Sequence, residues 1–513
     1  MESESHRAPG RDDPRGIGAL LADAAEARPD RRAVLSVEET PLEATYAMLD
    51  DGARRAAARL REAGIRVGDR VALVAENRMS FVTGWFGIAY AGATVVPIPI
   101  LSAAAEVSFR VEHSDCRAVV FDAARADLVA GAAPKRTRMP IEDLATGGDP
   151  GRPPGDIEPD RPAIILYTSG TTGLPKGALI SHRTLLAHAE GIGDHALGLG
   201  EDDCILGVLP LAHSYGLRMV LLATFRAGCR SVLVPRFDAA ATLDLARRER
   251  VTWIPAVPTM FSAWGALPEG PGIETLRWCL AAGSPLAQEV LHRAERRLGA
   301  EIRQGYGMTE ATFSTINAPP DDRVVNSVGR PAHGVEVRVT DDRGRDVPVG
   351  ETGEVRVRGQ NLMSGYLDDA AATREALADG WMHTGDVGRL DAAGRLFVVD
   401  RLKDMIIRGG YNIYPSEVEA VLIEHPDVKE AAVVGRPDEH FGEEIVALVV
   451  ANPGRRPDLD ELRRWATSQI AKNKMPREWA VRESLPLGPS RKVLKRVLRD
   501  RVADGSISVE RIG

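Results

Sequence analysis

The chain has 513 residues, of which 44% are hydrophobic. One hydrophobic core rarely serves more than about 250–300 residues, so this length predicts several packed units. The 65 basic and 73 acidic residues leave a formal net charge of -8, and no long basic block is present. This balance excludes nucleic acid as the main partner and favours a small-molecule substrate.

Neither the cysteines nor the N-terminal segment suggests secretion. The four cysteines form no CxxC pair and have no histidine at metal-ligand spacing, which predicts free, buried thiols in a reducing compartment. The first sixteen residues are polar and charged, and no run of about 18 apolar residues follows. We therefore expect a cytoplasmic protein without an integral membrane segment.

The first third of the chain alternates helices and strands. Hydrophobic patterning predicts helices over 17–27, 51–63 and 81–90, and strands over 70–74 and 94–98. This alternation is typical of parallel sheets covered by helices. Residues 132–160 are rich in Pro, Gly and Asp and predict a solvated connection.

A glycine- and threonine-rich segment, YTSGTTGLPKG, spans residues 167–177 and follows the apolar strand predicted over 163–166. Glycines let backbone N–H groups approach an anion, and Lys176 adds a positive charge. The segment therefore predicts a triphosphate cradle, although its spacing is not that of a Walker motif. A flexible surface loop is the alternative. The cradle residues are Thr168, Ser169, Gly170, Thr171, Thr172, Gly173 and Lys176.

The pattern changes twice after the middle of the chain. Residues 326–394 contain short alternating strands with Gly-rich turns, including 335–339 and 354–357, and predict a small β-rich subdomain. Beyond residue 401, helices over 415–424 and 459–471 flank strands over 430–434 and 445–450. The sequence therefore predicts a separate C-terminal α+β domain.

Two carboxylates follow glycine-containing turns. In the motif QGYGMTE, residues 304–310, Thr309 and Glu310 present a hydroxyl beside a carboxylate, a pair that suits Mg²⁺. Alternatively, Thr309 caps a helix with Glu310 in its first turn. In WMHTGD, residues 381–386, Asp386 is positioned to accept ribose hydroxyls, or it is simply a turn residue.

Three further motifs contain candidate residues. His213 lies in LPLAHSYG, Gly409 and Gly410 lie in RGGYNIYPSE, and Lys492 lies in SRKVLK near the C-terminus. Taken alone, a lone histidine is more often structural, the glycines fit a plain turn, and the lysine fits a solvated basic helix. The glycines would also let a slim ligand approach the backbone.

In this order, the motifs resemble the adenylate-forming superfamily of acyl-CoA synthetases, aryl-CoA ligases, luciferases and peptide-synthetase adenylation domains, over roughly residues 17–500. The resemblance implies that ATP and a carboxylic acid give an acyl-adenylate and pyrophosphate, after which a thiol displaces AMP. It implies an α/β fold with two helix-covered, mostly parallel sheets, a small β-barrel-like subdomain and a small mobile C-terminal α+β domain. The expected boundaries are residues 1–400, a hinge at 401–404, and residues 405–513.

The resemblance also implies residue roles. Glu310 would bind the metal, Thr309 the phosphates and Asp386 the ribose, with Arg401 as the charged neighbour of Asp386. Lys492 would supply charge during adenylation, Lys403 would lie at the hinge, and the Gly409–Gly410 face would receive the thiol arm. The other nucleotide contacts would be Gly283, Tyr306 and Gly307. The family usually has glycine where Arg491 stands, which puts the loop geometry in question.

The same resemblance places the acid beside His213, among Ser214, Arg218, Val257, Ala282 and Gly305. Ser214 stands where amino-acid activators usually have Asp, which disfavours an α-amino acid. Arg218 could face a second carboxylate or a polar ring substituent of the substrate, or it could form a structural ion pair. Fatty, aryl and dicarboxylic acids therefore all remain open.

We expect a stand-alone ligase, monomeric or homodimeric, that uses ATP, Mg²⁺ and CoA. An acyl carrier protein bearing phosphopantetheine is the alternative thiol donor. A non-catalytic protein that retains the nucleotide-binding fold is a third reading. The joint presence of Lys176, Glu310, Asp386, Arg401 and Lys492 argues against that reading.

Overall fold

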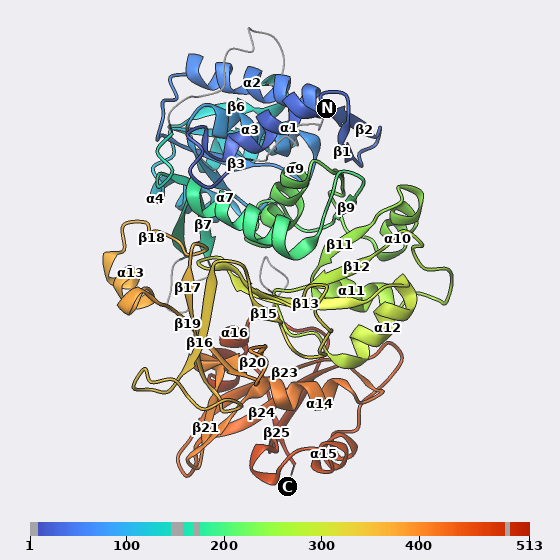
Figure 1. Ribbon diagram of the computed structural model, residues 1–513. Helices are drawn as coiled ribbons and strands as arrows, with labels where there is room; N and C mark the ends of the chain where they lie inside the picture. Colours follow the sequence, from blue (N-terminus) through green and yellow to red (C-terminus); the bar gives the residue numbers. More distant parts are fainter. Residues whose placement is uncertain (1–8, 145–156, 169–174, 488–492, 513) are drawn as a thin grey trace. The chain divides into compact units, whose positions relative to one another are not determined.

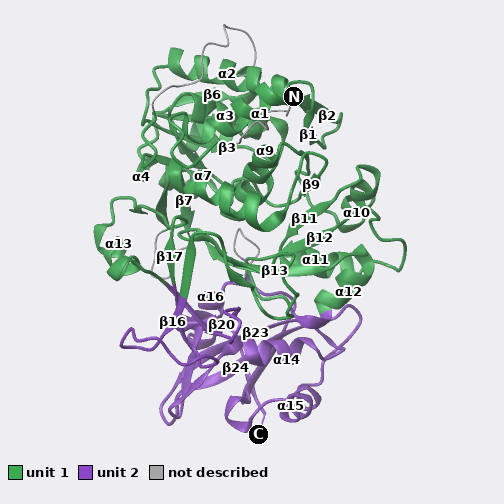
Figure 2. Ribbon diagram, in the orientation of Figure 1, with its two compact units in different colours: residues 1–286, 290–337, 357–383 green, residues 287–289, 338–356, 384–513 purple. Residues whose placement is uncertain are grey.

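The computed structural model describes residues 9–144, 157–168, 175–487 and 493–512 (Figure 1). The chain packs into two compact units, shown in different colours in Figure 2. The first unit comprises residues 1–286, 290–337 and 357–383, and the second comprises residues 287–289, 338–356 and 384–513. The domain boundary at residue 400 and the hinge at 401–404 remain predictions.

The first unit contains a nine-stranded sheet. Its six central strands are parallel, and antiparallel strands flank them on both sides. In sheet order the strands are β15 (Arg330–Pro331), β14 (Thr312–Ile316), β13 (Ile302–Met308), β12 (Trp278–Ala281), β11 (Trp253–Ala256), β9 (Cys204–Gly207), β10 (Arg230–Leu233), β1 (Arg32–Ser36) and β2 (Leu42–Thr45).

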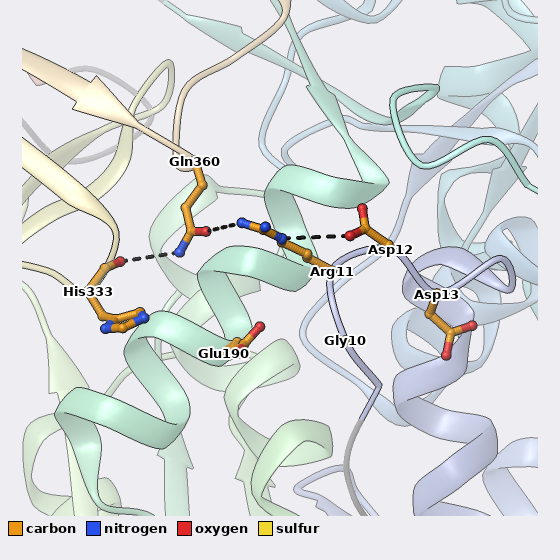
Figure 3. Close-up of a pocket in the computed structure, with 7 residues that line it drawn as sticks. All are labelled: Gly10, Arg11, Asp12, Asp13, Glu190, His333 and Gln360. Atoms are coloured by element: carbon orange, nitrogen blue, oxygen red, sulfur yellow. Dashed lines mark hydrogen bonds and ion pairs between the residues drawn. The ribbon is translucent and has the colours of Figure 1, made fainter.

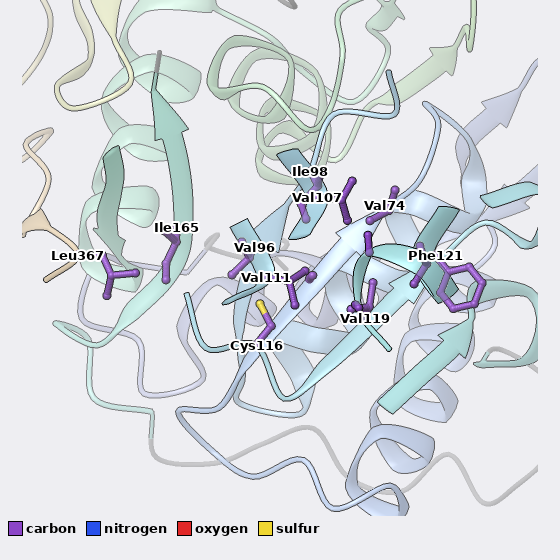
Figure 4. Packing of buried hydrophobic residues seen from close by; sticks show 14 residues of the cluster. Val74, Val96, Ile98, Val107, Val111, Cys116, Val119, Phe121, Ile165 and Leu367 are labelled. Atoms are coloured by element: carbon purple, nitrogen blue, oxygen red, sulfur yellow. The ribbon is translucent and has the colours of Figure 1, made fainter. Parts of the chain in front are cut away.

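A seven-stranded sheet forms the other half of the first unit. Its order is β18 (Gly365–Tyr366), β8 (Lys176–Ser181), β7 (Pro162–Thr168), β4 (Thr94–Pro97), β3 (Arg70–Val74), β5 (Ala118–Phe121) and β6 (Thr137–Pro140). The five strands from β7 to β6 are parallel. Strands covered on both faces read as continuous apolar runs, and Figure 4 shows β3, β4 and β5 contributing Val74, Val96 and Val119 to one buried cluster.

Some helices of the first unit begin at a capping side chain. Helix α2 starts at Tyr46 because the Thr45 side chain accepts a hydrogen bond from the Met48 N–H at 3.3 Å. The predicted helix over 51–63 therefore began too late. The helices are η1 (Gly16–Gly18), α1 (Ala19–Ala27), α2 (Tyr46–Glu62), α3 (Met79–Tyr90), α4 (Ala104–His113), η2 (Ala123–Arg125), α5 (Ala126–Ala132), α6 (Ile141–Leu144), α7 (His182–His188), η3 (Ala189–Leu197), α8 (Ser214–Gly216), η4 (Leu217–Leu222), α9 (Ala223–Ala227), α10 (Ala239–Arg248), α11 (Pro258–Gly265), α12 (Gln288–Leu298), α13 (Ala370–Ala376) and η5 (Ala378–Gly380).

The prediction of a barrel-like subdomain was wrong in its form. Among the described residues, the strands of this region make an open four-stranded sheet in the order β16 (Val335–Thr340), β17 (Gly353–Gly359), β19 (Met382–Leu390) and β20 (Leu396–Arg401). The predicted strands over 335–339 and 354–357 are confirmed as β16 and β17. Strand alternation does not report whether a sheet closes, because closure depends on the pairing of its edges.

The second unit also contains a sheet with a hydrophobic cluster on each face. Along the β23–β24 hairpin, Val433 and Ala447 belong to the cluster on the side of α14 and α15, whereas Val434 and Val446 belong to the cluster on the side of α16. The period-2 alternation of a strand explains this division. The elements are β21 (Ile406–Arg408), β22 (Tyr411–Ile413), β23 (Val428–Asp438), β24 (Gly442–Ala451), β25 (Glu478–Arg482), β26 (Glu510–Arg511), η6 (Leu402–Asp404), α14 (Pro415–Ile423), α15 (Leu459–Thr467), η7 (Lys472–Lys474) and α16 (Lys495–Ala503).

Other expectations can be compared with the described residues. The expected α/β class is confirmed, and Cys116, Cys204, Cys229 and Cys279 are free and buried, as predicted. Part of the predicted connection is regular structure, because residues 137–140 form β6, which pairs with β5, and α6 follows. None of the described helices is both long and apolar enough to cross a membrane.

Candidate active site

The predicted phosphate cradle lies between two antiparallel strands. Strands β7 and β8 pair over their whole length, and Thr168 lies opposite Lys176 in the register. The cradle residues Ser169, Gly170, Thr171, Thr172 and Gly173 lie outside the described residues. In a Walker motif a helix follows the loop, whereas here a strand follows it. The segment therefore connects two antiparallel strands, which agrees with the expectation that it is not a Walker motif.

Lys176 has two neighbours that come from much later in the chain. Its Nζ lies 3.8 Å from Oδ2 of Asp369 and 5.2 Å from the ring centroid of Tyr366. Both neighbours follow from the pairing of β18 with β8. The lysine is therefore held at one end of the seven-stranded sheet by an anion and an aromatic face.

Thr309 and Glu310 occupy the turn of a β-hairpin. Strands β13 and β14 are antiparallel, with Gly307 opposite Phe313 and Met308 opposite Thr312. The alternative in which Thr309 caps a helix is therefore wrong. The hairpin requires glycine at position 307, because a Cβ there would lie 1.9 Å from the Thr312 carbonyl oxygen.

The Glu310 carboxylate is buried and hydrogen-bonded. Only 7% of the residue is exposed, and the Tyr366 hydroxyl donates a hydrogen bond to Oε1 at 2.9 Å. Burial, together with the Glu310 charge, raises the pKa of Tyr366, so the phenol stays protonated and acts as the donor. The sequence reasoning missed Tyr366 because its contacts, Glu310 and strand β8, lie far away along the chain.

The ends of three parallel strands bring the predicted acyl-pocket residues together. Ala256 and Ala281 are the last residues of β11 and β12, and their register neighbour Gln304 is the last β13 residue that pairs with β12. Ligands of open α/β sheets bind at such edges. Val257, Ala282 and Gly283 follow the ends of β11 and β12, and Gly305, Tyr306 and Gly307 continue β13 beyond Gln304.

His213 and Ser214 lie at the start of a helix that reaches the same strand ends. The Tyr215 hydroxyl donates to the Leu280 carbonyl at 2.7 Å, which fixes α8 against β12. His213 precedes α8, and its Nδ1 accepts a hydrogen bond from the Tyr215 N–H at 3.3 Å. This contact is local, so it leaves the predicted role of His213 toward the acid as a prediction.

Arg218 lies in the π-helical segment η4 with only 2% of the residue exposed. Its guanidinium donates to the Ser214 hydroxyl and, at 3.5 Å, to the Thr309 carbonyl. Burial lowers the pKa of Arg218 to about 9, and the nearby Glu310 charge partly offsets that effect. The side chain therefore remains a cation at neutral pH. Single-turn π segments often occur at functional sites.

His188 is a neighbour that the sequence analysis did not single out. It ends α7, it is 4% exposed, and its ring centroid lies 6.5 Å from that of Phe313. Burial and the Arg218 charge keep the pKa of His188 well below its ordinary value, so the imidazole is neutral. A single histidine at the end of an apolar helix gives no sequence signal that separates a site from a core position.

In the second unit, Asp386 and Arg401 form an ion pair. They lie opposite each other on β19 and β20, and Nε of Arg401 is 3.0 Å from Oδ1 of Asp386. Asp386 is part of a strand, so the alternative of a plain turn residue is wrong. Lys403 follows in η6, where burial and the Arg401 charge lower its pKa.

Gly409 and Gly410 form the two-residue turn of the β21–β22 hairpin. Their φ angles are +58° and +82°, so both residues are in the left-handed region. Such tight hairpin turns need glycine-like residues at both positions, which explains the pair without a ligand. The predicted contact with CoA stays a prediction. Lys492 and Arg491 lie outside the described residues.

A surface pocket of about 490 Å³ is lined by none of these residues (Figure 3). Three of its polar residues are hydrogen-bonded to one another. Arg11 donates to Oε1 of Gln360 at 3.2 Å, and Nε2 of Gln360 donates to the His333 carbonyl at 3.3 Å. The pocket therefore does not compete with the strand ends as a candidate active site. Its lining residues are Gly10, Arg11, Asp12, Asp13, Glu190, His333 and Gln360.

Comparison with known protein families decides the class. The model of the AMP-binding enzyme family matches residues 21–367, and the model of the AMP-binding enzyme C-terminal domain matches residues 417–492. This chain belongs to the AMP-binding enzyme family. The predicted resemblance to the adenylate-forming superfamily is confirmed, and with it the class of AMP-forming acid–thiol ligases.

Individual members of the AMP-binding family match almost the whole chain. A feruloyl-CoA synthase of Amycolatopsis sp is 37% identical over 484 residues, covering 92% of this chain and 98% of that protein. The fatty acid–[acyl-carrier-protein] ligase ScoC of Streptomyces coeruleorubidus is 36% identical over 476 residues, covering 89% and 91%. The ATP-bound crystal structure of MatB from Rhodopseudomonas palustris is 31% identical with a TM-score of 0.89, covering 95% and 99%.

Proposed function

We propose that this chain is a carboxylic acid–CoA ligase. ATP and the acid would form an acyl-adenylate and pyrophosphate, and the CoA thiol would then displace AMP to give acyl-CoA. The observation that carries this proposal is the connection between the two phosphate-site elements of the first unit. Lys176 follows the cradle segment at the start of β8, and Glu310 lies in the β13–β14 turn. Tyr366 contacts both side chains.

The oxygen atoms at the β13–β14 turn are suitable ligands for magnesium. Mg²⁺ is commonly held by one or two protein carboxylates together with nucleotide phosphates and water. Glu310 supplies one buried carboxylate, and among the described residues no cluster of three or more His, Cys, Asp or Glu side chains forms a complete metal site. Glu310 would hold the ion, which would neutralise phosphate charge when bound, and Thr309 would contact the phosphates.

The remaining residues would bind the substrates and stabilise charge. Asp386 would accept the ribose hydroxyls, with its orientation set by Arg401. Lys492 would neutralise negative charge that develops at the α-phosphate. His213 would meet the acid's carboxylate at the strand ends that Val257 and Gly283 also border. These two residues are neighbours, because a Cβ on Gly283 would lie 3.7 Å from Cγ1 of Val257.

A carrier-protein thiol is the second candidate acceptor. A relative that is 36% identical is named a fatty acid–[acyl-carrier-protein] ligase, whereas a relative that is 37% identical is named a CoA synthase. Both acceptors present the same phosphopantetheine arm. The Gly409–Gly410 turn carries no side chain of its own, so it would suit either arm.

The deciding experiment measures pyrophosphate release from ATP and Mg²⁺ across fatty, aryl and dicarboxylic acids, with mass spectrometry of the products. We expect one acid class to give acyl-CoA when CoA is present. An acyl-adenylate that persists with CoA but is consumed by a phosphopantetheinylated carrier protein would support the second candidate. No pyrophosphate release with any acid would contradict both.

The Lys492→Ala variant assigns the first half-reaction within the same assay. It should lose pyrophosphate release almost completely and still convert a supplied acyl-adenylate to the thioester. In the second step the thiol attacks the acyl carbon and not the phosphorus, so the lysine charge is not needed there. The control is Lys429→Ala, which removes an exposed lysine paired with Glu430. Equal losses in both half-reactions would contradict the role proposed for Lys492.

A further inference from the structure

Tyr366 joins two elements that the chain separates widely. Its hydroxyl donates to Oε1 of Glu310 at 2.9 Å, and its ring lies 5.2 Å from Nζ of Lys176. Lys176 starts β8, whereas Glu310 lies in the turn after β13. One side chain therefore contacts the cation of the cradle and the carboxylate of the hairpin at the same time.

The backbone around Tyr366 is fixed on both sides. Tyr366 lies opposite Ala178 in the β18–β8 pair, and the Leu367 N–H donates to the Gly177 carbonyl at 2.8 Å. On the other side, the Met363 N–H donates to the Glu310 carbonyl at 2.7 Å. The segment 363–367 is thus hydrogen-bonded to the residue after Lys176 and to Glu310 itself.

The side-chain contact has a specific chemical effect. A carboxylate that accepts a hydrogen bond on one oxygen loses rotational freedom, and its remaining acceptor capacity points in a defined direction. Outer residues that orient metal ligands in this way are important for metal affinity. The aromatic face limits the positions of the Lys176 ammonium, since a cation is attracted to the centre of the ring.

We propose that Tyr366 is a positioning residue that orients Glu310 and Lys176 for the magnesium complex of the nucleotide, an inference that rests on the proposed function. Tyr366 acts through these two side chains and is not itself a ligand. Its hydroxyl orients the Glu310 carboxylate, and its ring limits the position of the Lys176 ammonium. The two parts of one side chain therefore have separable effects.

The test measures nucleotide affinity by calorimetry with a non-hydrolysable ATP analogue, with Mg²⁺ and with EDTA. Tyr366→Phe removes the hydroxyl and keeps the ring. We expect about tenfold weaker binding with Mg²⁺, as is typical of losing a hydrogen bond to a charged group, and little change with EDTA. Tyr366→Leu also removes the ring and should weaken binding in both conditions.

Tyr90→Phe is the matched control for the loss of a buried tyrosine–carboxylate hydrogen bond. The Tyr90 hydroxyl donates to Oδ1 of Asp50 at 2.6 Å, between α3 and α2 of the same unit. This variant should leave the difference between Mg²⁺ and EDTA unchanged. An equal loss of magnesium-dependent affinity in Tyr90→Phe and Tyr366→Phe would show that general destabilisation is the cause and would overturn the proposal.

A double-mutant cycle tests whether Tyr366 acts through Glu310. If it does, Tyr366→Phe should change magnesium-dependent affinity very little in the Glu310→Gln background. A full tenfold loss in both backgrounds would overturn the proposal. These measurements contain no acid and no thiol. A chain that activates no acid would therefore contradict the proposed function and still leave a clear result for Tyr366.

Discussion

Arg218 is a buried cation whose acceptors are neutral. It donates to the Ser214 hydroxyl and the Thr309 carbonyl, and in the described part of the chain it forms no ion pair with a carboxylate. The expectation of a structural ion pair is therefore not met. Taking a charge out of water costs several kcal/mol in typical proteins unless a partner compensates. A bound anionic or strongly polar group near Ser214 would supply such a partner.

Replacing Arg218 should change which acids the enzyme prefers. In Arg218→Met we expect kcat/KM to fall about 10- to 100-fold more for acids with a distal carboxylate or hydroxyl than for apolar acids of the same size, because a hydrogen bond to a charged group is lost. Competition assays with paired acids measure this ratio. A uniform loss for all acids would instead assign Arg218 to support of the Thr309–Glu310 turn.

The matched control is Arg226→Met on the same run of helices. The Arg226 side chain is also buried, but its guanidinium is paired with the Asp194 carboxylate. Its removal should affect stability and leave the ratio between the two kinds of acid unchanged. A similar change of preference in both variants would contradict the assignment of Arg218 to the acid pocket.

At the scale of elements, the β13–β14 hairpin determines where Glu310 lies. Gly307 makes the closest approach in this hairpin, because an added Cβ would lie 1.9 Å from the Thr312 carbonyl oxygen. Thr312 itself has a φ of +41°, which is uncommon for a β-branched residue. The turn therefore depends on tight backbone packing as well as on the side chains that surround Glu310.

Gly307→Ala should destabilise this hairpin. Overpacking typically costs about 1–3 kcal/mol, and here the neighbour is backbone, which cannot rotate away. We expect a lower midpoint of urea unfolding and weaker magnesium-dependent nucleotide binding. The control is Gly131→Ala in α5, where an added Cβ meets nothing within 4 Å and alanine should stabilise the helix. Unchanged stability and binding in Gly307→Ala would contradict the role of close packing.

The sequence predicted elements best where the pattern is local. Strand β3 was expected over 70–74 and occupies Arg70–Val74, because a short apolar run between turn signals defines a buried strand. The QGYGMTE motif was read as either a metal turn or a helix start. The antiparallel pairing of Met308 with Thr312 makes it a hairpin. A short turn that contains a hydroxyl and a carboxylate suits a helix start and a hairpin equally well, so its composition does not distinguish the two.

In the candidate site, too, the sequence predicted the residues that lie in local motifs and missed those defined by distant contacts. Glycine-rich and acidic motifs identified Lys176, Glu310 and Asp386 from their neighbours in the chain. Tyr366 and His188 were missed, because each matters through residues far away in sequence, namely Glu310 and Arg218. Specific contacts of this kind arise from tertiary packing, which a single sequence does not encode in any short window.

At the scale of the whole molecule, buried neutral histidines make stability depend on pH. His182 is 2% exposed, and its Nδ1 accepts a hydrogen bond from the Ile17 N–H at 3.1 Å. Burial and the Arg161 charge lower the pKa of His182 to about 4 from an ordinary value of 6.5. Between these values the unfolded chain binds a proton that the folded chain does not. Stability therefore falls as the pH drops from 6.5 toward 4.

The expected size of this effect is measurable. From pH 7.5 to 5.0, His182 should reduce the free energy of unfolding by about 2 kcal/mol. His182→Asn keeps an acceptor for the Ile17 N–H and removes the titration, so urea unfolding should depend less on pH by that amount. The exposed His440, replaced by Asn, is the control. An unchanged pH dependence in His182→Asn would contradict the assignment.

Strand β18 pairs with β8 but is translated much later than β8. Strand β8 ends at Ser181, but the strand that covers its outer edge begins at Gly365. Because a chain leaves the ribosome from its N-terminus, the cradle hairpin is made long before Tyr366 arrives. Until then the edge of β8 is open to pairing with other chains. Lys176, Glu310 and Tyr366 are therefore all present in the nascent chain only after most of the first unit has been translated.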